Sequence, residues 1–297
     1  MFTTKRRAVA IAIAAALAAA TLVACGSPAA VSANKVSLPK VASKIVSLSP
    51  TATESLFAMG AGRQVIAADS LSSYPILAPR TELSAFNLSV EAVAKYKPDL
   101  VILSFDTTSA KNALAAFAKL KIPVLLQPAA TTLSDVYEQI TELGKVTGRS
   151  ETATSIVDEM KKQIATIVKS TNPGAGIKVF HELDSTLYTA TSETFIGHIY
   201  KDFGLTNIAD AAGTADANGY PQLTSEYIVK ANPGLIYLTD TNYGESEFSV
   251  AKRPGWNKIE AVQARRIVSL NPDISSRWGP RVVEIYREIA GAIPASM

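Results

Sequence analysis

Cysteine and histidine are scarce in this chain: its 297 residues include one cysteine and two histidines. One cysteine cannot form an intramolecular disulfide, and His181 and His198 alone leave a histidine-based metal cluster sparse. The G-x-S-x-G elbow, the P-loop, the Rossmann fingerprint and the H-E-x-x-H zinc motif are also missing from the sequence. These absences argue against an enzyme and against a resident metal or cofactor. A single His or Tyr as an axial ligand to haem iron stays open.

The first residues form a targeting segment. Three basic residues, 5–7, precede an uncharged apolar run at 8–22, which is shorter than the about 20 residues of a transmembrane helix. We therefore expect a signal peptide at 1–24. Cys25 at the cleavage point resembles the lipobox of bacterial lipoproteins, although an ordinary signal with a fortuitous cysteine is an alternative. Acylation of Cys25 would explain the lone thiol and predicts an extracytoplasmic protein anchored to the cell membrane.

An excess of positive or negative charge is also lacking once the predicted signal peptide is removed. The chain has 29 basic and 26 acidic residues, and three basic but no acidic ones lie within 1–24, so the mature chain is formally neutral. Nucleic acid, which needs a concentrated basic face, is therefore not an expected partner. Residues 25–43, rich in Ser, Ala, Pro and Val, are predicted to form a flexible tether from the lipid to the folded part.

Short apolar runs alternate with helix-like patterns in the rest of the chain. Runs of strand length occur at 45–48, 65–68, 100–103 and 124–126, with helical stretches between them. Alternating strands and helices predict an α/β fold with mainly parallel sheets.

An internal repeat indicates two such units. Residues 88–104 recur at 223–239, with six identical positions among 17. Each copy has an N-cap residue, an apolar helix face, a proline and a buried strand, and Glu91 and Glu226 occupy the same place. Any α/β chain repeats such units, but the shared glutamate favours two related lobes. We expect these lobes at 44–149 and 172–297.

One long amphipathic helix is predicted between the lobes, at 150–171. Ile156, Met160, Ile164 and Ile167 recur at spacings of three and four, and no Gly or Pro interrupts the segment from residue 151 to 171. A single bridging helix predicts only small opening and closing movements.

These motifs together resemble a known family. The segment 44–54 (KIVSLSPTATE), the strand entry 97–101 (KPDLV) and the bridging helix are similar to the periplasmic binding proteins for cobalamin, iron siderophores and haem. The resemblance covers essentially the whole mature chain. It implies two α/β lobes joined by one helix, a ligand between the lobes, and an ABC permease dimer with its ATPase as partner.

The resemblance also implies roles for the paired glutamates. Cobalamin-binding members use one acidic residue on each lobe to contact arginines of the permease, and Glu91 and Glu226 match these positions. A carboxylate in the first turn of a helix also favours the positive end of the helix dipole, which is the alternative. We expect permease docking in addition to this local effect.

Further residues are expected to contact the ligand. The spacing at 273–281 is similar to that of cobalamin-binding members, where Asp273 and Arg277 would reach the amide rim of a corrin. A local ion pair that caps the last helix is the alternative, favoured more for Arg281 than for Arg277. Aromatic residues that precede or follow the predicted strands are candidates for flat contacts with the ligand: Tyr74, Phe86, Phe105, Tyr188 and Tyr220.

The identity of the ligand follows less directly. Leu71 and Tyr220 stand where the cobalamin-binding members have a tyrosine and a tryptophan. We expect cobalamin or a related corrinoid first, a ferric siderophore second and haem third, so the transported ligand is a cobalt or iron chelate. The protein is expected to be a monomer. A surface lipoprotein of another class and an enzyme are the remaining alternatives.

Overall fold

The computed structural model describes residues 40–104, 108–171, 174, 176–212 and 219–294. The predicted signal peptide, the predicted tether up to residue 39 and Phe105 lie outside this part of the chain. Within it, none of the helices combines the length and the apolar character that a membrane span requires.

The first sheet contains four parallel strands. They are β1 (Ile45–Leu48), β2 (Val65–Ala68), β3 (Leu100–Leu103) and β4 (Val124–Leu126), in the order β2-β1-β3-β4. Aliphatic side chains of β1 and β3 are buried on both faces of the sheet, as expected for parallel strands covered by helices. Ile45 and Leu100 pair in register and pack into one core, whereas Val46 and Val101 belong to another.

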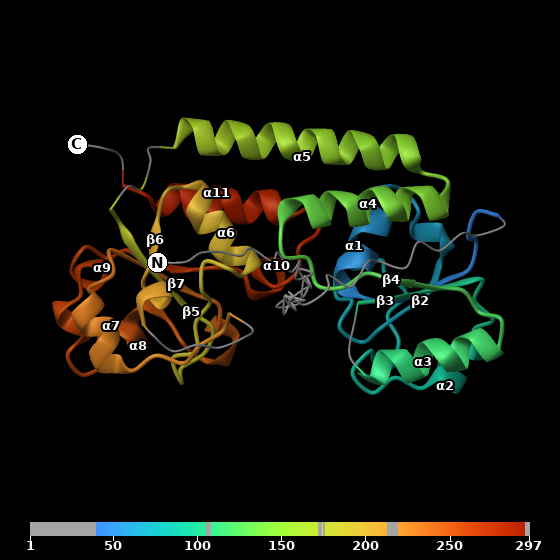
Figure 1. Cartoon of the computed structure of the whole chain (residues 1–297), viewed down its shortest axis with the longest axis horizontal. Coiled ribbons are helices and arrows are strands. Elements are labelled where there is room, and N and C mark those ends of the chain that lie inside the picture. Colours follow the sequence, from blue (N-terminus) through green and yellow to red (C-terminus); the bar gives the residue numbers. More distant parts are fainter. Residues whose placement is uncertain (1–39, 105–107, 172–173, 175, 213–218, 295–297) are drawn as a thin grey trace, which may run out of the picture. The chain divides into compact units, whose positions relative to one another are not determined.

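Four helices cover this sheet: α1 (Pro50–Ala58), α2 (Val90–Ala94), α3 (Thr108–Lys119) and α4 (Leu133–Thr147). Figure 1 shows α1 and α4 on one face and α2 and α3 on the other. Polar caps start the helices, since Ser49, Ser89 and Thr132 each accept a backbone N–H bond. A short 3-10 turn, η1 (Gly62–Gln64), leads into β2.

The second sheet has the same topology. Its strands β5 (Lys178–Glu182), β6 (Thr206–Asn207), β7 (Leu235–Leu238) and β8 (Ile267–Ser269) are parallel in the order β6-β5-β7-β8. Its helices are α6 (Phe195–Asp202), α7 (Ser225–Ala231), α8 (Glu247–Ala251) and α9 (Glu260–Gln263). Short 3-10 turns are η2 (Ile208–Ala211), η3 (Thr241–Tyr243) and η4 (Trp256–Lys258). The predicted α/β fold with two parallel sheets is therefore confirmed.

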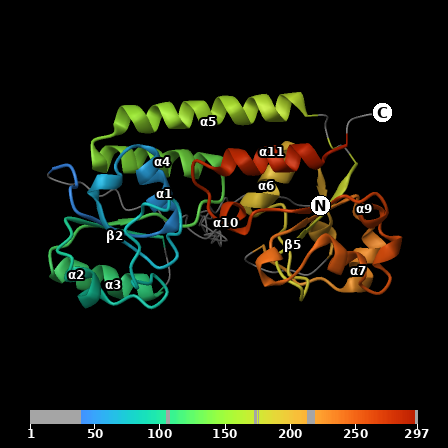
Figure 2. The same ribbon diagram turned by 180° about the vertical axis from the view of Figure 1, so that it is seen from behind.

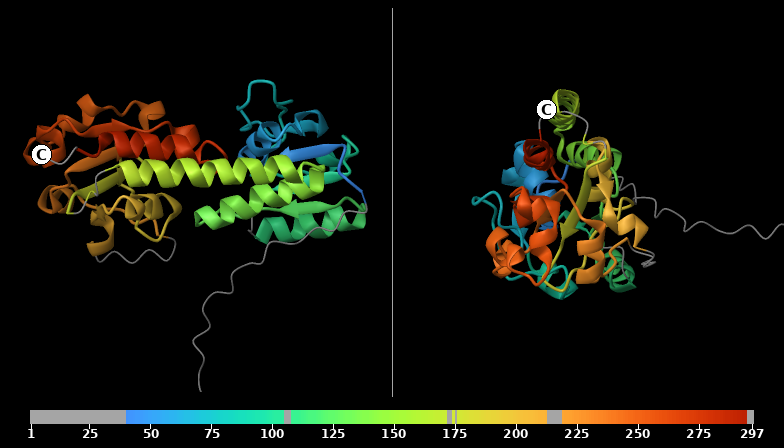
Figure 3. Two further views of the ribbon diagram at one scale, coloured as in Figure 1. Left: turned by 90° about the horizontal axis from the view of Figure 1, so that it is seen from above. Right: turned by 90° about the vertical axis from the view of Figure 1, so that its left-hand side faces the viewer.

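The helix α5 (Ser150–Ser170) runs between the two sheets in the sequence and packs along α4 and along α11 (Val282–Ala292). Figures 2 and 3 show α5 beside these two helices from other directions. The approach of α4 to α5 is close, because a side chain at Gly144 would meet the Ala153 methyl group. A short helix, α10 (Pro272–Ser275), precedes α11.

One core cluster is continuous across both sheets. It includes Ile45 and Leu100 of the first sheet, Tyr237 of the second, and Met160 of α5. Opening the two lobes widely would expose part of this apolar surface, so the core favours the small movements predicted from the bridging helix.

Candidate functional site

The predicted ligand residues lie at the carboxyl ends of strands. In a parallel sheet these ends share one edge, where α/β proteins commonly bind ligands. Tyr74 and Phe86 follow β2, Tyr188 follows β5, and Tyr220 follows β6. Their exposed fractions are 47%, 71%, 42% and 42%, so these four rings are not core residues. Each ring is partly accessible to solvent.

Arg277 joins two of the carboxyl-edge loops. Its Nη2 lies 3.0 Å from Asp273 Oδ1, and its Nη1 donates to Ser73 Oγ at 3.0 Å. The Arg277 side chain is largely buried, whereas about half of Asp273 is exposed. The loop after β8 is thus bonded to the loop after β2 beside Tyr74. The Asp273–Arg277 ion pair is local, as the alternative interpretation has it, but it is also part of this contact.

Arg281 has a different partner from the one expected. The interpretation as a local ion pair is wrong, because Nε and Nη2 of Arg281 donate to Oε2 of Glu54 at 2.9 and 2.6 Å. The backbone N–H of Arg281, at the start of α11, also donates to Glu54 Oε1 at 3.3 Å. The guanidinium lies 3.8 Å from the centroid of the Tyr74 ring. The buried Glu54 carboxylate on α1 therefore binds the start of α11 directly, and it positions the Arg281 guanidinium against the Tyr74 ring.

A buried polar network lies beneath the same loop. The Ser72 hydroxyl donates to Asp69 Oδ1 at 2.6 Å and lies 3.0 Å from the Thr53 hydroxyl, which donates to Ser47 at 2.9 Å. Burial raises the pKa of Asp69, while the hydrogen bond from Ser72 and the charge of Arg277 act in the opposite direction. Ser47, Thr53 and Glu54 all belong to the segment 44–54. The sequence analysis did not predict this network, although the polar positions of that motif could have indicated it.

A second charged cluster lies after β5 and β7. Glu182, the last residue of β5, accepts two bonds of 2.6 Å from Arg253, which also pairs with Glu245 at 2.9 Å. Asp240 is buried, and neither carboxylate oxygen has a hydrogen-bond partner among the described residues. Burial raises the pKa of Glu182 to about 7 and also raises that of Asp240. Sequence reasoning missed this cluster.

The two histidines already have partners. His181 Nδ1 lies 2.7 Å from the Tyr200 hydroxyl in the core, and burial lowers the pKa of His181 to about 4. His198 Nδ1 lies 2.9 Å from the Thr131 carbonyl oxygen. Over the described part of the chain, His, Cys, Asp and Glu side chains form no group of three suited to a metal ion.

Glu91 and Glu226 occupy matching places, in the first turns of α2 and α7. Both are exposed, and both helices begin on the carboxyl-edge side of their sheets. Neither carboxylate forms an ion pair with another described residue. This geometry is compatible with dipole stabilisation and with a partner that contacts both lobes.

The described part of the chain has two surface hollows. One is lined by Phe57, Arg63, Leu77 and Arg149 among others, and the second lies between α5 and α11. Neither is lined by a predicted ligand residue. We therefore place the candidate site by the strand ends and the exposed rings.

The chain is similar to several known proteins. A family model described as periplasmic binding protein matches residues 45–274. An uncharacterised ABC transporter substrate-binding lipoprotein of Bacillus subtilis, YvrC, is 34% identical over 265 residues, which cover 87% of this chain and 82% of the relative. A cobalamin-binding protein of Halobacterium salinarum is 27% identical, with coverage of 86% and 71%. The crystal structure of a possible iron-binding protein of Staphylococcus epidermidis superimposes with a TM-score of 0.73 at 28% identity, covering 86% of this chain and all of that one.

Proposed function

Because the chain belongs to the periplasmic binding protein family, we propose that it captures a bulky metal chelate for an ABC importer, with cobalamin or a related corrinoid as the first candidate. One observation carries this proposal: partly exposed aromatic rings stand at the carboxyl edges of both sheets, and the Asp273–Arg277 pair is bonded to the loop that carries one of them, Tyr74. Flat rings suit a large planar ligand, while the ion pair offers both a donor and an acceptor to amide groups. The family favours binding and transport over catalysis.

A ferric siderophore is the second candidate, and the similarity to a possible iron-binding protein supports it. For haem, an axial protein ligand is needed. His181 is buried against Tyr200, so the exposed phenols of Tyr74, Tyr188 and Tyr220 are better placed for that role. Haem is therefore the third candidate.

The proposal includes a membrane anchor and a partner. Lipid on Cys25 holds the mature protein at the outer side of the cell membrane, as the similarity to a substrate-binding lipoprotein supports. Glu91 and Glu226 then meet the two similar halves of a permease dimer, which works with its ATPase. The binding protein acts as a monomer with one docking carboxylate on each lobe.

The ligand class is tested by parallel incubation of the purified protein with cobalamin, ferric siderophores and haem, followed by gel filtration and an absorption spectrum. Cobalamin should co-elute with the protein and show the corrin bands. Retention of a ferric siderophore or haem alone would select that chelate instead. If no chelate is retained, the proposed ligand class is wrong.

A further inference from the structure

The edge of the first sheet opposite the candidate site gathers four chain segments. Because β1 to β4 are parallel, the turns that precede them meet at the amino ends of the strands. The Asp99 carboxylate accepts backbone N–H bonds from Ser43 and Lys44, and Ala42 N–H donates to the Val146 carbonyl at 2.9 Å. The end of α4 is therefore held against the segment by which the chain enters the domain.

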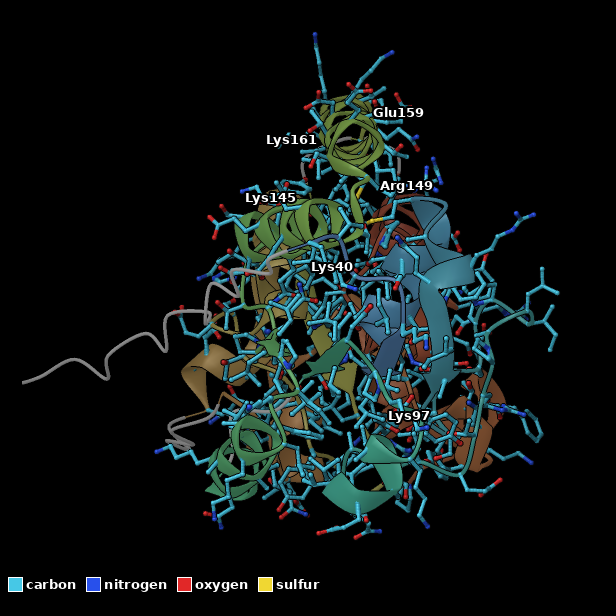
Figure 4. All side chains as sticks on the ribbon, turned by 90° about the vertical axis from the view of Figure 1, so that its right-hand side faces the viewer. Lys40, Lys97, Lys145, Arg149, Glu159 and Lys161 are labelled. Carbon is cyan, nitrogen blue, oxygen red and sulfur yellow. The ribbon has the colours of Figure 1, made fainter. Side chains whose placement is uncertain are left out.

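This amino-edge face is rich in exposed cations. None of them forms an ion pair with another described residue, and the nearby Asp99 carboxylate is occupied by backbone N–H groups. Figure 4 looks onto this end of the protein and labels four of them. The nine cations are Lys40, Lys44, Arg63, Lys95, Lys97, Lys119, Lys121, Lys145 and Arg149.

Exposed apolar side chains lie between these cations. Tyr96 is 38% exposed between Lys95 and Lys97, and Leu120 is 52% exposed between Lys119 and Lys121. Val41, next to Lys40, is 50% exposed. Lysines that flank a tyrosine or an aliphatic residue are typical of protein surfaces at a membrane interface, where the apolar group enters the headgroup region.

The second lobe shows that the fold does not require this pattern. Cations near the C-terminal end of a helix interact favourably with the helix dipole, which accounts for Lys95 and for its counterpart Lys230. Lys97, however, has a positive φ of 51°, and the matching residue Asn232 has 53°. Asparagine tolerates this backbone conformation better than lysine does, and the position of Tyr96 is Ala231 in the second copy. The lysine and the tyrosine of the first lobe are thus not explained by the turn.

We propose that the amino-edge face binds the anionic lipid surface of the membrane in which the protein is anchored. This inference rests on the proposed lipid at Cys25. Lys40 is only 15 positions after Cys25, so it cannot lie more than about 50 Å from Cys25, whatever the path of the chain. Confinement at this distance keeps the face at a high effective concentration near the bilayer. Electrostatic attraction then acts within about a Debye length of the headgroups, about 8–10 Å.

The test uses the lipidated protein in vesicles of phosphatidylcholine, with or without phosphatidylglycerol. The rate of amine acylation at each lysine is measured by mass spectrometry. Lysines of the amino-edge face should react about fivefold more slowly on the anionic vesicles, and high salt should remove this protection. Lys230 and Lys258 in the second lobe should react equally on both. Equal rates at Lys40, Lys97 and Lys145 on the two vesicle types would overturn the inference.

A pair of matched variants separates the face from total charge. The first variant carries Lys95→Gln, Lys97→Asn, Lys119→Gln and Lys121→Asn. Lys121, like Lys97, has a positive φ (57°), and Asn preserves both turns. The control removes the same charge elsewhere, with Lys169→Gln, Lys230→Gln, Lys252→Gln and Lys258→Gln. Protection of Lys40 and Lys145 should disappear in the first variant and persist in the control, and any other pattern contradicts the inference.

Failure of the anchor gives a different result. If Cys25 carries no lipid, the protein is not retained on neutral vesicles, which counts against the proposed anchoring. Binding of the amino-edge face is then measured by flotation of the protein with anionic vesicles. Protein that floats with neither vesicle type overturns the membrane-binding face as well.

Discussion

Glu54 and Arg281 are 227 residues apart in the sequence, yet the Glu54 carboxylate accepts two guanidinium bonds and one backbone bond from Arg281. Glu54 is almost completely buried, and the Arg281 side chain is mostly buried beneath the Tyr74 ring. This ion pair joins α1 of the first lobe to the start of α11. Because the Arg281 guanidinium also lies over the Tyr74 ring, the ion pair positions this guanidinium against the loop after β2.

Replacing Glu54 by glutamine should destabilise the protein by about 3 kcal/mol, because a largely buried guanidinium loses its counter-charge. Urea unfolding without ligand measures this change. The matched control is Glu138→Gln on the exposed face of α4, which should change the free energy of unfolding by less than about 0.5 kcal/mol. Equal stability of the two variants would mean that the ion pair is not structural.

The strands could be predicted from the sequence because their burial is local information. β1 to β4 occupy the four apolar runs at 45–48, 65–68, 100–103 and 124–126. Continuous aliphatic runs of this length, separated by helical patterns, suit parallel strands buried on both faces. The positions of Tyr74, Tyr188 and Tyr220 after strands then follow from the parallel topology.

The ion pairs could not be predicted in this way. Glu54–Arg281 and Glu182–Arg253 join residues 227 and 71 positions apart, and periodicity describes only which face of one element is apolar. The sequence therefore does not predict the partner of Arg281 on another helix. The identity of the ligand is unpredictable for the same reason, since ligand specificity depends on side chains that converge from several loops.

The stability of the protein should depend on pH through His181. Its pKa is lowered to about 4 by burial, so the unfolded chain takes up a proton between about pH 6.5 and 4 while the folded protein does not. The free energy of unfolding is therefore highest, as far as His181 is concerned, above pH 6.5, and it falls by about 3 kcal/mol as the pH is lowered to 4. His181→Gln should flatten the curve of unfolding free energy against pH over this range. An unchanged slope would contradict the assignment.

Lipid anchoring depends on Cys25. Cys25→Ala should leave the protein unprocessed or unanchored, because the alanine offers no sulfur for acylation. Partitioning into a detergent phase, compared between wild type and variant, measures this. A variant that still enters the detergent phase as a processed protein would exclude a lipid at this position.

Docking depends on Glu91 and Glu226. Charge reversal with Glu91→Arg or Glu226→Arg should reduce uptake of the chelate, and the double variant should nearly abolish it, because attraction to the permease becomes repulsion. Affinity for the chelate should stay at the wild-type value. Each substitution also places a cation near a helix N-terminus, at a cost of about 0.5–1 kcal/mol.

Glu151→Arg is the matched control for this prediction, since Glu151 is exposed in the first turn of α5. It should lose similar stability and retain transport. Full uptake by the folded double variant would return Glu91 and Glu226 to a role in helix stability alone.

Capture of a chelate between the carboxyl edges of the two sheets is tested most directly by calorimetric titration of the wild type and Arg277→Ala with cobalamin. Arg277 offers a charged donor beside the loop that carries Tyr74, and its loss should weaken binding by about 1.5–3 kcal/mol. Arg63→Ala, an exposed arginine on the opposite edge, should bind as the wild type does. We expect one site per chain in the wild type and clearly weaker binding in Arg277→Ala alone. Equal affinity in all three proteins would contradict this location of the site.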